Sequence, residues 1–96
     1  MAKTESVAVA TFYSFDVGQV KEFRSEADAL EFIRQTKDEE IRNDRDEMGY
    51  EFRETLGNEP GTFTYDEAPD GSWFRIEEIR RDGAHDTTIW FIAIQN

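Results

Sequence analysis

The sequence predicts an α+β domain: a small, mostly antiparallel sheet of about five strands in the order ββααβββ, with the helices packed on one face. Segments rich in β-branched and aromatic residues lie near both ends of the chain, at 6–15 and 87–95. Residues 25–56 show the apolar spacing of three and four that is typical of helices. Since 96 residues suffice for only one typical core, we expect a single domain over 1–96.

The strand at 6–15 is apolar on both faces, which predicts a central position in the sheet. Asp16-Val17-Gly18 has the composition of a turn. Residues 19–24 then pair back as a hairpin, and their charged content suits an edge strand. The segment at 87–95 is also apolar on both faces, so we expect it to be central and to neighbour the first strand.

A helix is expected to begin at Ser25, whose side chain can cap the first turn. Asp28 occupies the position from which a capping-box acid reaches back to the helix start. The expected buried stripe of this helix consists of Ala27, Ala29, Leu30, Phe32 and Ile33.

A second helix is predicted from about 37 to 56, after a kink or restart near residue 36. The segment 36–39 matches another capping box, and Gly57 would end the second helix. In it, the residues expected to face inward are Ile41, Met48, Phe52 and Leu56.

Loops and short strands complete the chain. We expect a loop at 57–61, a strand around 62–65, a turn at 68–72, a strand at 73–80 and a turn at 81–86.

If the helices cover one face of the sheet only, something else must shield the second apolar face of the central strands from water. A bent sheet, long side-chain stems and a homodimer are the alternatives.

The composition is acidic: 22 Asp and Glu stand against 11 Lys and Arg, for a net charge of -11. Such charge disfavours direct contact with nucleic acid or anionic lipid and favours basic or neutral partners. The absence of cysteine excludes disulfides and thiolate metal sites. With neither a membrane-spanning run nor a signal pattern in the sequence, we expect a cytoplasmic protein.

Acidic residues recur at steps of four and three along the predicted second helix, which would place them in one row. Carboxylates repeated every helical turn would approximate the phosphate spacing of a nucleic-acid backbone. The alternative is an ordinary solvated helix face. Tyr50 would lie exposed beside this row and could anchor an arginine-rich partner. The predicted partner-binding residues are Glu40, Asp44, Glu47, Tyr50, Glu51 and Glu54.

No catalytic motif accompanies the acids, so we expect neither an enzyme nor a cofactor. Acidic turns at 66–70 and 82–86 do not fit the spacing of a calcium-binding loop, and no metal is expected. His85 is the single histidine and falls in a predicted turn, without an accompanying nucleophile motif.

The leading hypothesis is therefore a non-enzymatic inhibitor or adaptor that docks an acidic helix surface on a basic, nucleic-acid-binding surface of another protein. In charge and size the chain is similar to the small acidic inhibitors of phages and mobile elements, some of which evade host defence by nucleic-acid mimicry. The alternative function is a small-molecule or nucleotide-binding module, with its cleft at a homodimer interface.

Overall fold

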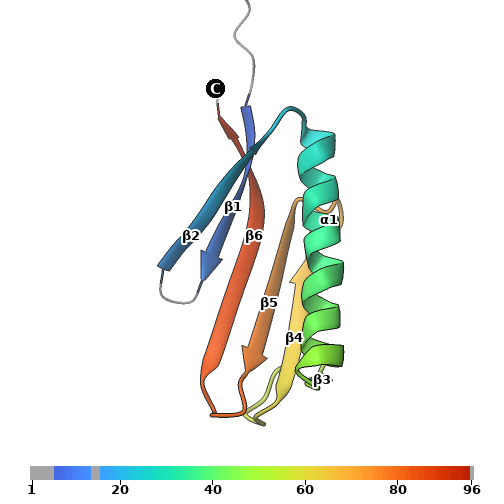
Figure 1. Ribbon diagram of the computed structural model, residues 1–96, viewed down its shortest axis with the longest axis vertical. Coiled ribbons are helices and arrows are strands. Elements are labelled where there is room, and N and C mark those ends of the chain that lie inside the picture. Colours follow the sequence, from blue (N-terminus) through green and yellow to red (C-terminus); the bar gives the residue numbers. More distant parts are fainter. Residues whose placement is uncertain (1–5, 14–15, 96) are drawn as a thin grey trace, which may run out of the picture.

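A computed structural model describes residues 6–13 and 16–95 and confirms the α+β class (Figure 1). These residues form one six-stranded sheet, in the order β2-β1-β6-β5-β4-β3, with one long helix on it. The elements are β1 (Ser6–Tyr13), β2 (Asp16–Phe23), α1 (Glu26–Arg42), a π-helical turn η1 (Asn43–Glu47), β3 (Glu51–Phe52), β4 (Thr62–Glu67), β5 (Trp73–Ile79) and β6 (His85–Gln95).

The sheet confirms the predicted placement of the N- and C-terminal strands. β1 lies between β2 and β6, and β2 is an edge strand. All neighbours pair antiparallel except β3, which adds two residues parallel to β4 at the other edge. The turn predicted at 16–18 is wrong, because β2 already begins at Asp16. Residues 14 and 15 of the first predicted strand lie outside the described residues.

The start of α1 follows the prediction. The Ser25 hydroxyl accepts a hydrogen bond from the Asp28 backbone N–H at 3.1 Å, which satisfies one free donor of the first turn. Ala29 and Ile33 are buried, whereas Ala27 is exposed and does not belong to the stripe. In the part of the chain that the structure describes, no helix is long and apolar enough to cross a lipid bilayer.

The second predicted helix is wrong. α1 runs without a restart through residue 36 to Arg42, and η1 then ends the helical stretch at Glu47. Gly49 reverses the chain, since its φ of +70° is a left-handed conformation that glycine adopts without steric cost. Gly57 consequently caps no helix and lies in the loop before β4.

This reversal also changes which side chains enter the core. Met48 and Phe52 are exposed instead of buried, because Met48 lies in the turn and Phe52 in an edge strand. Ile41 and Leu56 are half-buried. Tyr50 is the residue that the turn inserts into the interior, where it is only 4% exposed.

The main core lies between α1 and the sheet. Phe74 and Trp90 stack at its centre, with ring centroids 5.3 Å apart. Ala29 and Ile33 supply the helix side of this layer. The sheet and the turn contribute Val7, Val9, Tyr50, Phe63, Phe74, Ile76 and Trp90.

The face of the sheet away from α1 is only partly covered. Figure 1 shows the helix on one face of the sheet. On the opposite face Phe12 stacks on Phe91 at 5.3 Å, and both Phe12 and Val20 remain exposed. A homodimer that covers this apolar patch stays a prediction.

Candidate functional site

The five acids of the predicted row do not share one helix face, because α1 ends before four of them. Glu40 is on α1, Asp44 and Glu47 are in η1, Glu51 is in β3, and Glu54 is in the loop that follows. Glu40, Asp44 and Glu47 stay close to one another around the end of the helix, as the residues of two adjoining hollows. Glu51 instead pairs with Arg53 at 2.7 Å, and Glu54 lines a different hollow.

Tyr50 is buried, so its predicted role as an exposed interface anchor is wrong. It packs into the core beside Gly49, and Arg81 covers it from outside. The Arg81 guanidinium lies 5.6 Å from the centre of the Tyr50 ring, and its Nη2 donates a hydrogen bond to the Met48 carbonyl at 2.7 Å. Tyr50 therefore fastens the turn to the sheet.

The structure assembles a cluster of carboxylates that the sequence did not reveal. An open hollow of about 240 Å³ lies where α1, η1, β5 and β6 meet. Its lining includes Glu40 of α1, Asp44 of η1, Glu78 of β5 and Asp86 of β6, with Arg80 beside them. We call these four acids the carboxylate cluster.

Glu78 and Asp86 could not be assigned to this cluster from the sequence, because they join it only through the pairing of β5 with β6, where they are directly opposite each other. One signal was present in the sequence. Glu78 follows Phe74 and Ile76 at a spacing of two, so it continues the apolar face of β5 toward the helix.

Asp44 is the most unusual acid of the cluster, since only 4% of it is exposed and no ion pair reaches it within the described residues. Burial raises the pKa of Asp44 to about 8, and the negative charge of Glu78 adds to this effect. The pKa of Glu78 is also raised by burial, while its hydrogen bond with Asp44 opposes the increase. The two carboxyl groups thus share a proton, which Asp44 donates to Glu78.

The negative charge extends along the end of α1. Burial raises the pKa of Glu40, and repulsion from Glu78 and Glu39 raises it further. A second open hollow, of about 430 Å³, is lined by Glu39, Glu40 and Glu47, with Arg42 and Asn43. The partial negative charge at the C-terminus of a helix reinforces the field of these acids.

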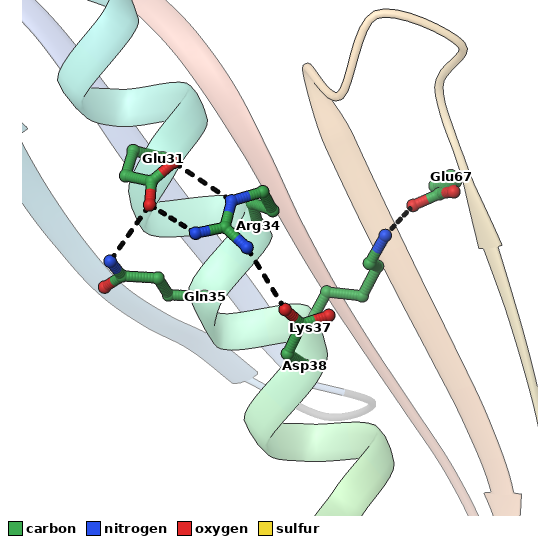
Figure 2. A network of polar contacts seen from close by, with 6 residues as sticks. All are labelled: Glu31, Arg34, Gln35, Lys37, Asp38 and Glu67. Atoms are coloured by element: carbon green, nitrogen blue, oxygen red, sulfur yellow. Dashed lines mark hydrogen bonds and ion pairs between the residues drawn. The ribbon is translucent and has the colours of Figure 1, made fainter.

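The middle of α1 differs, because its charges are neutralised within the molecule (Figure 2). Arg34 pairs with Glu31 and, at 3.3 Å, with Asp38. Lys37 reaches across to Glu67 of β4 at 2.9 Å. Among the described residues, by contrast, no ion pair engages Glu39, Glu40, Asp44, Glu47 or Glu78.

These acids lack the arrangement of a metal centre: within 6–13 and 16–95, no group of acids and histidines has the geometry to hold a metal ion. The charge of both hollows also opposes an anionic ligand such as a nucleotide. What the arrangement offers is a negative surface that can accept cationic side chains by charge-assisted hydrogen bonds.

No protein-family model, no curated protein and no solved structure matches this chain.

Proposed function

We propose that this protein binds a basic surface of a partner protein through the end of α1. The negative end consists of Glu39, Glu40 and Glu47 on the outside, with Asp44 and Glu78 in the hollow beneath them. The observation that supports the proposal is the gathering of these acids at one place where, among the described residues, no ion pair engages any of them, while Glu31, Asp38 and Glu67 along the middle of α1 are ion-paired.

The negative end is unfavourable for the folded chain by itself. Glu39 and Glu40 lie in the last turns of α1, where a negative charge opposes the helix dipole by about 0.3–1 kcal/mol. Burial raises the pKa of Glu40, and repulsion from Glu78 and Glu39 raises it further, which adds to this cost. A cationic partner would relieve both effects, which gives a binding role a physical basis.

A nucleic-acid-binding protein is the class of partner that offers a suitably basic groove, and occupying that groove would make this protein a non-enzymatic inhibitor or adaptor. The regular phosphate-like spacing expected of a helical row is no part of this proposal, since the acids come from a helix, a turn and a strand. Recognition would depend on the local density of charge. Long-range attraction would speed encounter and weaken as salt is added.

Binding of a labelled lysine-rich peptide, followed by fluorescence anisotropy, tests the proposal. The double variant Glu39→Gln, Glu47→Gln removes two exposed charges from the negative end. We expect its affinity to fall about five- to tenfold, as the loss of two exposed ion pairs implies. Affinity of the wild type should also fall steeply between about 50 and about 300 mM salt.

The matched control is Glu22→Gln, Glu26→Gln, which removes the same charge near the start of α1, where no ion pair involves either residue in the described structure. Its affinity should stay within about twofold of the wild type. Equal losses in the two double variants would mean that binding follows net charge alone and would refute a local site. Capture from a cell lysate with the same pair of variants would then identify the natural partner.

One observation favours a second candidate function, acid–base catalysis. Asp44 and Glu78 form a proton-sharing carboxyl pair in an open hollow, and groups with strongly raised pKa values concentrate at catalytic sites. Two carboxyl groups that share one proton act together in the hydrolysis of peptide bonds by aspartic proteases. Cleavage of unstructured fluorogenic peptides by the wild type, abolished in Asp44→Asn, would support catalysis, and no cleavage would exclude it for these substrates.

A further inference from the structure

A patch of uncharged apolar side chains lies on the face of the sheet away from α1. The strand register sets its middle, because Ala10 of β1 is directly opposite Val20 of β2 and Phe91 of β6. Phe12 lies two residues along β1 and stacks on Phe91, with ring centroids 5.3 Å apart. We call this surface the far-face patch, and it consists of Ala10, Phe12, Val20, Ile89, Phe91 and Ala93.

The alternation of side chains along the strands separates this patch from the main core. Val9 of β1 and Trp90 of β6 belong to the core beneath α1, so the residues that flank them point to the opposite face. Val20 is 57% exposed and Phe12 is 37% exposed. The far-face patch therefore presents apolar surface to water, and covering that surface would be favourable.

The patch is uncharged, although the chain has a net charge of -11. Neither β1 nor the segment 87–95 of β6 contains an acidic or basic residue. A cationic partner finds no carboxylate within the patch, so this surface does not suit the basic partner of the negative end. An acidic partner would be repelled by the net charge of the chain.

We propose that the far-face patch is the interface of a homodimer in which the sheets of two copies pack face to face. A two-fold axis brings one surface against an identical surface, so each uncharged apolar patch would cover the other. Because α1 lies on the opposite face of the sheet (Figure 1), both helices would be on the outside of the dimer.

This arrangement keeps the acidic helices apart. Packed sheets are about 10 Å from each other and a helix is about 10 Å across, so the two helix axes would be roughly 30 Å apart. That distance exceeds three screening lengths at physiological salt, so the charges of α1 would repel the second copy only weakly.

The size of the patch indicates a weak dimer. Three strands about 4.8 Å apart, with about six residues along each, make roughly 300 Å² of flat sheet. Projecting aromatic rings and a polar rim would bring the area buried per copy to about 500 Å², which is at the low end for a specific interface. We therefore expect monomer and dimer to exchange reversibly.

The inference is independent of the proposed function, because the negative end is on the helix side of the sheet. Salt should act on the two interactions in opposite directions. Screening weakens the attraction of a basic partner, whereas it reduces the repulsion between two copies of an acidic chain and so favours the dimer.

Sedimentation velocity of the full chain, at about 5 to about 500 μM and at about 50 and about 500 mM salt, tests the dimer. The mass should rise from one chain toward two with concentration, and the dissociation constant should be at least about threefold lower at the higher salt. Val20→Lys places an ammonium group in the patch and should raise the dissociation constant at least about tenfold, although it makes the chain less negative.

The matched control is Met48→Lys, which makes the same change of charge at an exposed apolar residue in the turn after η1. Its dissociation constant should stay within about twofold of the wild type. Amide resonances of Phe12 and Phe91 should shift when the wild type is diluted, which locates the contact on the face of the sheet. Circular dichroism of both variants establishes that they are folded.

A mass of one chain at every concentration and both salt levels would overturn the homodimer. Equal effects of Val20→Lys and Met48→Lys would also overturn it, because association would then not depend on the far-face patch. Shifts confined to β2 on dilution would indicate pairing of two edge strands and would overturn the face-to-face arrangement.

Discussion

Replacing Asp44 by Asn should stabilise the protein, and should do so mainly at alkaline pH. Asp44 is buried, and its carboxyl group donates the proton that it shares with Glu78. When that proton is lost, two negative charges face each other near Glu40 and Asp86, and the cation that lines the same hollow, Arg80, is already paired with Asp86 and Asp82. An asparagine amide can donate the same hydrogen bond to Glu78 without ever ionising.

The sign and size of the change in the free energy of unfolding follow from the pKa values of Asp44 in the unfolded and the folded protein. In the unfolded chain the pKa is 3.8, and in the folded protein it is about 8. Between these values unfolding releases a proton, so each pH unit lowers the free energy of unfolding by up to about 1.36 kcal/mol. The upper limit over the whole interval is about 6 kcal/mol. Because the hollow is open to solvent, we expect Asp44→Asn to gain about 2–4 kcal/mol at about pH 9 and less than about 1 kcal/mol at about pH 5.

Urea unfolding at several pH values between about 5 and 9 measures this difference directly. The control is Asp46→Asn, which removes the same charge from the same turn, where Asp46 is exposed and lies 3.6 Å from Arg45. The control should keep the pH dependence of the wild type. The reasoning is refuted if Asp44→Asn loses stability as steeply as the wild type on going from acidic to alkaline pH.

Three further predictions concern the helix, the turn and the ion pair across to β4. Ser25→Ala should lower the free energy of unfolding by about 1 kcal/mol, measured by urea titration, because it removes the cap of α1. Gly49→Ala should cost about 1 kcal/mol, since its φ is +70° and a new Cβ would lie 3.2 Å from an Arg81 nitrogen, whereas Gly57→Ala, with open space around it, should change stability by less than about 0.5 kcal/mol. A double-mutant cycle on Lys37 and Glu67 should give a coupling below about 1 kcal/mol, because both side chains are partly exposed.

The strands could be predicted from sequence because each has a local signature. The segments predicted at 6–15 and 87–95 are apolar on both faces, and in the structure the corresponding strands β1 and β6 are adjacent and central. The helix start at Ser25 was equally predictable, since capping depends on residues within one turn of each other.

The end of the helix could not be predicted from spacing alone. Residues 43–54 keep an acid every three or four positions, which imitates a continuing helix. The chain instead turns at Gly49, because the burial of Tyr50 and the hydrogen bond from Arg81 to the Met48 carbonyl stabilise the turn. Arg81 is far away in sequence, so propensity was overridden by a tertiary contact.

The carboxylate cluster likewise could not be predicted in full from the sequence, because it depends on contacts between distant segments. Glu40 and Asp44 were predictable as neighbours at a spacing of four, but Glu78 and Asp86 are brought to them only by the register of β5 and β6. The burial of Asp44, which sets its protonation, also follows from that assembly and has no counterpart in the local sequence.

The β1–β6 pairing determines where a label, a sensor surface or a fused protein can be attached without covering the negative end. Ser6 is opposite Gln95, and Val7 is opposite Phe23, just before α1 begins, so the outer ends of both strands lie beside the start of the helix. The 17 residues of α1 span about 25 Å, so the negative end lies well away from the outer ends of β1 and β6. A label, a sensor chip or a fused protein joined before β1 or after β6 would leave the negative end exposed and accessible to a partner.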